Sequence, residues 1–429
     1  MSRATHAVAP DDRIGGPFGV VTDDGLPVER RTVDTAPGSE ALSRLPAALR
    51  DRIVIDVIHD GDCVPARYLR DSDGQHVAFE RYAAAYHADR DWGATLVAEA
   101  LARHLAVAAI HRVRIARVLM DFGRFPGLTT AGADYLERFA INYPFSSWLG
   151  FDQKQRLLRD AYDAIAAHYD GIVRNSITKI AIHTYDTFNR SGTMRPELSI
   201  CSQALSYRGR HELPDHFFDP LYPDALAEGT ADRVLRDRIS LTAEKAGFRV
   251  AHNYPYALPD GSVEVRAQVW SFFCYLQDRY LADHSAVADD PSTQMVFQML
   301  QDTNLRRADS EALRGYLHMF RLAPVGAETA FAGAQRAYEA IAAYMDRERA
   351  TLTEGYERSQ RRLSSIGIEV RKDLVWQLDG DTPVAPRPEA AEAIGRVLAE
   401  AVLTYFCADR PEIVALHKVH DQSVAPLKA

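Results

Sequence analysis

Two histidines at the polar ends of apolar runs are the first residues in this chain that could carry chemistry. His59 ends the run that begins at Ile53, and His183 lies in the run from Ile177 to Thr184. A histidine at the end of a buried strand is either a hydrogen-bonded structural residue or a ligand or catalyst. Two such histidines at one edge of a sheet favour a ligand or catalytic role.

Asp91 is the acidic residue that would complete a metal site with these histidines. It stands directly before a helical pattern, where an aspartate commonly acts as an N-cap, and that role remains an alternative. Zinc bound by two histidines and one carboxylate, with water in the fourth position, is a standard hydrolytic arrangement. The metal lowers the pKa of the water and polarises a carbonyl. Such a site also needs a carboxylate that acts as a base.

Alternating strand and helix patterns must position these side chains. Apolar, β-branched runs predict strands at 53–59, 113–122, 177–184, 198–201, 248–253 and 366–375, and amphipathic patterns predict helices at 91–107 and 152–173. The alternation predicts an α/β fold with a mixed, mostly parallel sheet flanked by helices. Ligands of such sheets sit beyond the carboxyl ends of the strands, where His59, Arg124 and His183 fall.

The same patterns divide the chain into a catalytic domain, an insertion and two terminal segments. Consecutive helical patterns without strand signals predict the insertion, and a last amphipathic helix is expected at 388–406. The predicted parts are an N-terminal leader or surface strap at 1–45, the first part of the catalytic α/β domain at 46–256, a helical insertion at 257–362, the last catalytic strand at 363–380, and a C-terminal helix and tail at 381–429.

Composition excludes several classes of protein. The 429 residues are 47% hydrophobic and 25% charged, which is typical of a globular protein. A net charge of −9 without a basic stripe argues against nucleic-acid binding. Four widely spaced cysteines form no CxxC pair, and no stretch approaches the ~18 apolar residues of a membrane span. We therefore expect a cytoplasmic protein with no membrane or nucleic-acid partner, and its oligomeric state stays open.

Five separated motifs resemble, in order, motifs of the N-formylglutamate amidohydrolase family. They are Ile58-His59-Asp60-Gly61 followed by Pro65, Asp89-Arg90-Asp91-Trp92, Ala116 to Arg124, Ala181-Ile182-His183-Thr184 and Ile368-Glu369-Val370-Arg371. The resemblance covers residues 50–256 and 363–378. It implies a fold related to zinc carboxypeptidases and aspartoacylase-type deacylases. It also implies one catalytic zinc and hydrolysis of an amide on an amino-acid-like substrate.

The resemblance assigns roles to individual residues. It implies that His59 and His183 are zinc ligands, that Asp91 is the third ligand, and that Glu369 is the base and proton shuttle. Asp62 is an alternative to Asp91, because it follows His59 by three residues, the spacing at which carboxypeptidase-like sites place their acidic ligand.

Arg124 is expected to bind the substrate. It matches the position where the family shows Asn-Arg, and the resemblance implies that this arginine grips a substrate carboxylate through its planar fork. The preceding residue here is Gly123 instead of Asn, which removes an expected amide donor and leaves substrates other than N-formylglutamate open. Asp121, inside the same motif, is expected to be structural and to hold Arg124.

Two further arginines are candidate substrate contacts. Arg371 lies on the same strand face as Glu369, because side chains alternate with period two. It either orients Glu369 or binds the substrate, or it simply forms an ion pair with Glu369. Arg195 lies in the loop after His183, and it either contacts the substrate or is a solvated surface charge.

These residues predict a zinc-dependent amidohydrolase, a deformylase-like enzyme that cleaves the N-formyl, N-acyl or peptide amide of a carboxylate-bearing substrate. Glu369 would take a proton from the attacking water and return it to the leaving nitrogen. The substrate would be a small molecule or a peptide. The alternative is a catalytically inactive, hydrolase-like binding or assembly protein, which Gly123 and the long insertion suggest.

Overall fold

The computed structural model describes residues 13–126, 139–204 and 219–424, apart from positions 37, 228, 260, 305, 360, 361 and 381. Within these residues, seven strands form one sheet in the spatial order β1-β3-β2-β4-β7-β5-β6. The strands are β1 (Val28–Thr32), β2 (Ile53–Val57), β3 (Ala109–Val113), β4 (Thr178–Tyr185), β5 (Leu198–Cys201), β6 (Val250–His252) and β7 (Ser364–Arg371).

The sheet is mostly parallel. Strands β3, β2, β4 and β7 run in one direction, and β5 is parallel to β6. The pairs β1–β3 and β5–β7 are antiparallel. The predicted α/β fold with a mixed, mostly parallel sheet and flanking helices is therefore confirmed.

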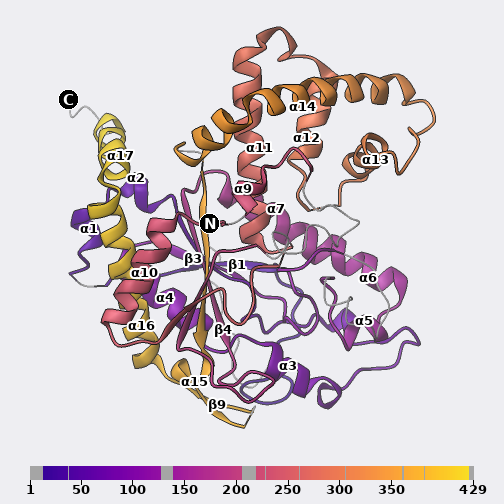
Figure 1. Cartoon of the computed structure of the whole chain (residues 1–429). Coiled ribbons are helices and arrows are strands. Elements are labelled where there is room, and N and C mark those ends of the chain that lie inside the picture. The colour runs from indigo at the N-terminus through magenta and orange to yellow at the C-terminus, as the bar shows by residue number, and fades with distance from the viewer. Residues whose placement is uncertain are drawn as a thin grey trace, which may run out of the picture.

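Helices cover both faces of this sheet (Figure 1). On one face, α4 (Ala94–Leu105), α10 (Arg233–Lys245) and α16 (Pro388–Thr404) share one apolar core with isoleucines of β2, β4 and β7. The helices α5 (Phe145–Trp148), α6 (Phe151–Leu157) and α7 (Asp163–Val173) lie on the other side of the sheet in Figure 1. The shorter helices are α1 (Ala41–Arg44), α2 (Ala47–Arg50), α3 (Ala83–Asp89), α9 (Asp224–Ala227) and α15 (Lys372–Val375).

The second face of the central strands is polar although it is buried. Residues that alternate with the core isoleucines point to it, because side chains along a strand alternate between faces. These residues are Asp56 on β2, Lys179 and His183 on β4, and Glu369 on β7, and all four are buried. A buried polar face must be filled by specific partners, since unpaired polar groups are costly there. Sites for chemistry are therefore expected on this face.

Four long helices occupy the stretch predicted as a helical insertion. They are α11 (Val263–Asp283), α12 (Pro291–Leu300), α13 (Ala308–Leu317) and α14 (Glu328–Glu357), and they surround a core of their own that includes Phe272, Phe273 and Phe297. In Figure 1 they stand above the sheet. Helix α11 contacts the sheet through an ion pair. Glu264 Oε1 in its first turn lies 2.8 Å from Lys179 Nζ of β4.

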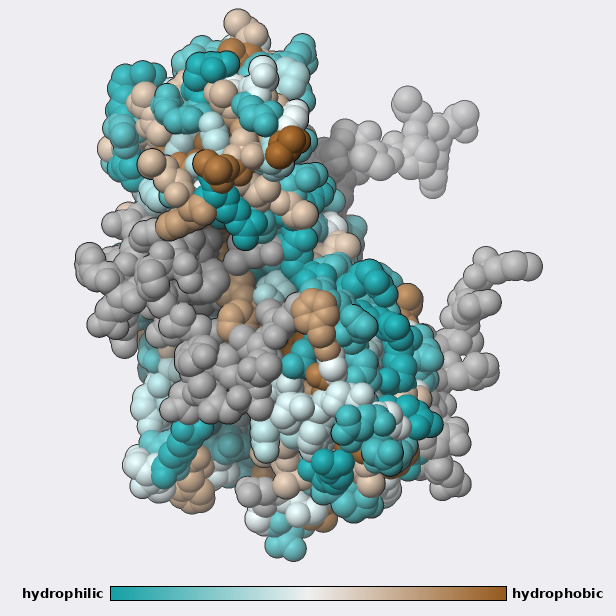
Figure 2. Space-filling view, turned by 90° about the vertical axis from the view of Figure 1, so that its right-hand side faces the viewer, coloured by the Kyte–Doolittle hydropathy of each residue, from teal (hydrophilic) through white to brown (hydrophobic). Residues whose placement is uncertain are grey.

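Apolar side chains are exposed on the part of the chain formed by α11 to α14. Figure 2 shows brown residues scattered among polar ones on its surface. The segment after α13 contributes four exposed apolar residues, Met319, Phe320, Leu322 and Val325. None of the helices that the structure describes has the length and apolar character needed to cross a bilayer.

The predicted strand at 113–122 is wrong. The strand β3 ends at Val113, and the following apolar residues form turns in which Leu119 and Met120 donate backbone hydrogen bonds to Ala116. The apolar residues of this run are buried, and an apolar run is compatible with buried turns as well as with a strand. The turns bring Asp121 next to His59.

Both ends of the chain are more structured than the sequence indicated. Within the predicted leader, whose residues 1–12 lie outside the described part, β1 forms the antiparallel edge of the sheet. The last strand ends at Arg371 instead of 375, and the hairpin of β8 (Trp376–Asp379) and β9 (Thr382–Pro386) follows. A further helix, α17 (Pro411–Val424), lies beyond the expected last helix.

Candidate functional site

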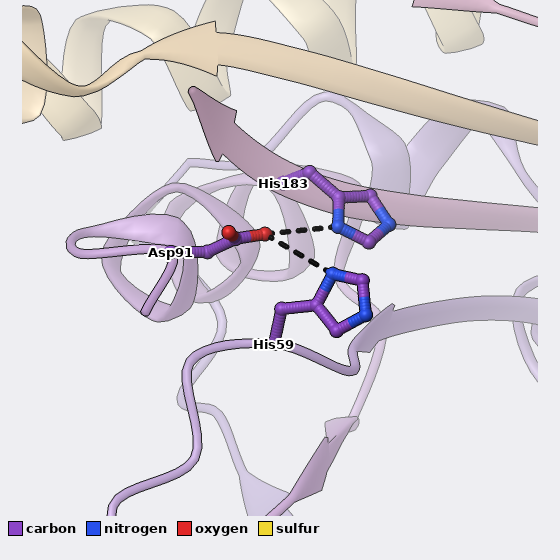
Figure 3. Close-up of side chains that lie close together, drawn as sticks. All are labelled: His59, Asp91 and His183. Carbon is purple, nitrogen blue, oxygen red and sulfur yellow. Dashed lines mark hydrogen bonds and ion pairs between the residues drawn. The ribbon is translucent and has the colours of Figure 1, made fainter. Parts of the chain in front are cut away.

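His59, Asp91 and His183 converge on one buried point beside the polar face of the sheet (Figure 3). His59 follows β2, Asp91 precedes α4, and His183 lies near the carboxyl end of β4. Asp91 Oδ2 lies 2.9 Å from His183 Nδ1 and 3.6 Å from His59 Nδ1. Each residue offers one ligand atom, and these atoms all lie within 4.8 Å of one another.

The donor set fits a small tetrahedral cation. Two imidazole nitrogens and one carboxylate oxygen are the ligands of many catalytic zinc sites, with an open fourth position. Ligand atoms at about 2.0–2.1 Å from a tetrahedral ion are about 3.4 Å from one another. The observed 2.9 and 3.6 Å separations bracket that value. The two histidine nitrogens thus lie near the carboxylate oxygen at distances that suit ligands of one ion.

Asp121 fixes the orientation of His59. Its Oδ1 lies 2.7 Å from His59 Nε2 and also accepts the backbone N–H of Gly123 at 2.8 Å. Burial opposes ionisation of Asp121, but the charges of His59, Arg117 and Arg124 keep its pKa well below the ordinary value. An ionised Asp121 accepts the Nε2 proton, so His59 Nδ1 is directed to the cluster as a ligand atom.

The cluster is strongly polarised. Burial alone would raise the pKa of Asp91, but its bonds to His183 and His59 lower the pKa below the ordinary value, so it is a carboxylate. Burial alone would lower the pKa of His183, whereas the bond to Asp91 and the charge of Glu369 raise the pKa to about 9. Without a metal, the proton on His183 Nδ1 supplies the positive charge that faces the Asp91 carboxylate. A metal ion bound by the two residues would displace this proton.

Glu369 lies beside this cluster. In the parallel pairing of β4 and β7, Glu369 is directly opposite His183, so the two side chains share the polar face. Its Oε1 accepts a short hydrogen bond from the Tyr256 hydroxyl. Its Oε2 is buried and has no hydrogen-bond partner among the described residues. Burial raises the pKa of Glu369, which brings a carboxylate base nearer to neutral pH.

Arg124 is held at the edge of the site by two partners. Its Nε lies 3.2 Å from Asp121 Oδ2, as expected, and its Nη1 donates to Asn142 Oδ1 at 2.8 Å. The Arg124 side chain remains 23% exposed. Asn142 thus supplies an amide next to Arg124, although Gly123 carries none.

Gly123 is closely packed against the pair formed by Asp121 and His59. A Cβ atom at this position would lie 3.0 Å from Asp121 Oδ1 and 3.3 Å from His59 Nε2. A larger residue would therefore press against the pair that orients His59. The missing asparagine noted in the sequence has a local structural reason.

Arg195 and Arg371 meet around Tyr185, at the end of β4. Arg371 forms an ion pair with Asp373 at 2.7 Å and donates to the Arg195 carbonyl at 3.2 Å. An ion pair between Arg371 and Glu369 is not present among the described residues. Arg195 is half-buried and stacks on Tyr185 with its guanidinium carbon 5.2 Å from the ring centre. Arg371 lies two residues beyond Glu369 on β7, and the contact of both arginines with substrate stays a prediction.

Asp62 does not join the cluster. Its carboxylate pairs with Arg13 at 2.7 Å and with Arg112 at 3.1 Å. Burial opposes this charge, yet the arginines lower the pKa of Asp62 far below the ordinary value. The group of potential metal-binding residues found in the described part of the chain contains Asp91 instead.

Three residues of the site were not singled out from the sequence. Arg117 bridges Asp121 at 3.0 Å and Asp91 at 3.5 Å, and it stands four residues before Asp121, so its spacing could have indicated this role. Asn142 and Tyr256 reach the site from distant segments of the chain. No local pattern marks either of them.

The fold and the site define an α/β protein with a buried His-Asp-His group that can hold a metal ion, next to a buried glutamate. No protein-family model matches the chain, and no curated protein sequence matches it.

Two solved structures are similar in fold. One is the N-formylglutamate amidohydrolase from Ralstonia eutropha, with 12% identity and a TM-score of 0.44 over 92% of this chain and 100% of that one. The other is a gene product of Agrobacterium tumefaciens, with 14% identity and a TM-score of 0.41 over 88% of this chain and 95% of that one.

Proposed function

We propose that the protein is a zinc-dependent amidohydrolase that cleaves an N-formyl, N-acyl or peptide amide of a substrate carrying a carboxylate. The observation that supports it most directly is the convergence of His59, Asp91 and His183, with Glu369 opposite His183. A cytoplasmic location rests on the sequence alone and stays a prediction.

Three side chains of the site would bind the metal, and a fourth would transfer protons. Zinc held by His59, Asp91 and His183 would lower the pKa of a water molecule and polarise the amide carbonyl. Glu369 accepts a proton from the attacking water through Oε2, which has no partner among the described residues, and returns it to the leaving nitrogen. The hydroxyl of Tyr256 holds the other oxygen and so limits the rotation of the carboxylate.

Arg124 orients the substrate. Its guanidinium donors form a fork that matches the two oxygens of a carboxylate. Asp121 contacts both Arg124 and His59, so it fixes the distance between the carboxylate-binding group and the metal-binding group. The substrate is therefore expected to carry its carboxylate at a fixed distance from the scissile amide, as an N-acyl amino acid does.

Metal analysis tests the proposal. We expect about one zinc ion per chain in the purified protein, because the three ligand atoms form one site. His59→Ala and His183→Ala should each lose the metal and the hydrolysis of N-acyl amino acids. His104→Ala is a matched control, since His104 lies outside the cluster and pairs with Glu392.

Two results would contradict the proposal. Full activity in a protein freed of metal would show that the cluster is not needed. A protein that binds zinc but hydrolyses none of a panel of N-formyl, N-acetyl and other N-acyl amino acids and short peptides would favour the inactive scaffold.

Arg124→Lys separates binding from chemistry. The ammonium group keeps the charge but cannot form the fork, so KM should rise by an amount equivalent to about 1–3 kcal/mol. The zinc content and kcat should change little, because Arg124 is not among the ligands. Steady-state kinetics with a carboxylate substrate and with its amide analogue check this. An Arg124→Lys enzyme with unchanged KM and reduced kcat would contradict the assignment.

A further inference from the structure

The first turn of α11 reaches from the helical insertion to the turn that carries Arg124. Figure 1 shows α11 running between the sheet and the helices above it. Arg266 in its first turn donates through Nη2 to the Phe122 carbonyl at 2.8 Å, and its guanidinium carbon lies 4.5 Å from the centre of the Phe122 ring. Arg266 is buried, so both contacts are made in the interior. A residue of the insertion thus holds the backbone two positions before Arg124.

Tyr162 links Arg266 to Arg124 itself. Arg266 Nη1 donates to the Tyr162 hydroxyl at 2.9 Å, and this hydroxyl donates to the Arg124 carbonyl at 3.0 Å. Tyr162 is fully buried and packs against Phe122, with the ring centres 5.0 Å apart. The carbonyls of the two residues that flank Gly123 are therefore both held, one by Arg266 and the other by Tyr162.

Arg266 joins segments that are distant in the sequence. Besides its contacts with Phe122 and Tyr162, it donates through Nη1 to Asn304 Oδ1 at 2.8 Å. A guanidinium presents its donors in a rigid, planar fork, so it holds these acceptors at fixed relative positions. A lysine has the same charge but no fork, and it cannot reproduce this geometry.

The chain just before α11 packs against the same turn. A Cβ atom at Gly261 would lie 2.7 Å from the Phe125 backbone nitrogen and 2.8 Å from the Arg124 carbonyl carbon. Glycine allows two backbone segments to approach this closely. The insertion therefore contacts the turn around Arg124 at two points, through Gly261 and through Arg266.

Different groups hold the two ends of Arg124. Asp121 and Asn142 contact its guanidinium, whereas Arg266 and Tyr162 hold the backbone from which the side chain extends. A change in the second pair removes no donor from the guanidinium, but it loosens the position of the fork. Charge-assisted hydrogen bonds depend on distance and angle, so a displaced fork binds a carboxylate less tightly.

We propose that Arg266 and Tyr162 are positioning residues, through which α11 of the insertion sets the affinity for the substrate carboxylate. The inference rests on the proposed function, in which Arg124 binds that carboxylate. Neither residue touches the substrate, and neither is among the potential metal ligands. Their effect is therefore confined to how well Arg124 is aligned.

Tyr162→Phe tests the proposal with the smallest change in shape. For the N-acyl amino acid that the wild type cleaves fastest, KM should rise about threefold to tenfold, while kcat and zinc content change little. For the same molecule with its carboxylate converted to a carboxamide, KM should change less than about twofold, because a neutral group forms no charge-assisted bond with Arg124. Equal changes in KM for both substrates would overturn the proposal.

A second variant and a control separate alignment from general loosening of the insertion. Arg266→Lys keeps the charge but loses the fork, and it should raise KM for the carboxylate substrate in the same selective way. Tyr344→Phe is the matched control, since the hydroxyl of this buried tyrosine donates to Asp283 at the opposite end of α11. It should leave both KM values unchanged. A rise as large as that in Tyr162→Phe would refute a specific role for Tyr162.

Hydrogen–deuterium exchange measures the alignment without turnover. The backbone N–H groups of Gly123 and Arg124 both donate hydrogen bonds, so their exchange reports on the order of the turn. Exchange should be faster in Tyr162→Phe and Arg266→Lys than in the wild type, and unchanged in Tyr344→Phe. Equal exchange in all four proteins would contradict the proposal. If the wild type cleaves no substrate, the proposed function fails, and exchange alone decides whether the two residues hold this turn.

Discussion

Glu369→Gln is expected to lower kcat by roughly 10²–10⁴ while the protein keeps its zinc. Glutamine has nearly the same shape and can still accept the hydroxyl of Tyr256, but it cannot take a proton from water. Glu369 is not among the three potential metal ligands, so the metal should stay. Steady-state kinetics on N-acyl amino acids, together with metal analysis of the same sample, measure both effects.

A control and a pH profile sharpen this test. Glu354→Gln changes a glutamate that is 64% exposed on α14 and should leave kcat unchanged. Burial raises the pKa of Glu369, so kcat/KM of the wild type should decrease as the pH is lowered. The midpoint of this decrease should lie above pH 4.3, the ordinary pKa of glutamate. That limb should vanish in Glu369→Gln. Loss of zinc from Glu369→Gln would mean that this residue is a ligand and that another group is the base.

Lys179→Met should destabilise the protein by about 3–5 kcal/mol at pH 7. Lys179 is fully buried, and its Nζ lies 2.8 Å from both Asp56 Oδ1 and Glu264 Oε1. Methionine has a similar length but removes the ammonium group that the two buried carboxylates share. Chemical denaturation measures the free energy of unfolding. Lys245→Met, at an exposed residue of α10, should change that free energy by no more than about 0.5 kcal/mol.

The effect of Lys179→Met should depend on pH. In the wild type, burial opposes the charge of Glu264, but Lys179 and His183 lower its pKa to about 2. This depressed pKa stabilises the fold above the unfolded value of about 4.3, and the stabilisation is lost as the pH falls towards 2. Without Lys179 both carboxylates have raised pKa values, so the variant loses stability as the pH rises above about 4. A difference between variant and wild type that is constant from pH 4 to 8 would contradict this account.

The sequence by itself determined the central strands and the candidate ligands. The runs around Ile55, Ile180 and Ile366 are β-branched and apolar, and each of them forms the predicted buried strand. His59 and His183 were evident because each interrupts such a run with a polar side chain. Asp91 was a candidate metal ligand, although its position before a helix also allowed an N-cap, and the motif resemblance assigned roles to Glu369 and Arg124.

Only the tertiary structure decided which acid joins the histidines. Asp62 and Asp91 are both aspartates close to a strand or helix end. The spacing of three residues after His59 favoured Asp62, whereas the motif resemblance favoured Asp91. In the fold, Arg13 and Arg112 neutralise Asp62, whereas Asp91 at the start of α4 points to the two histidines.

The partners that orient the site were likewise decided by the fold. Tyr256 and Asn142 come from segments far from Glu369 and Arg124 in the chain, and the turns at 114–126 replace an expected strand. Local sequence patterns depend only on residues that are close along the chain, so they predicted the strands on which His183 and Glu369 lie. Contacts between distant segments depend on how the turns and helices pack, and those contacts decided which side chains meet.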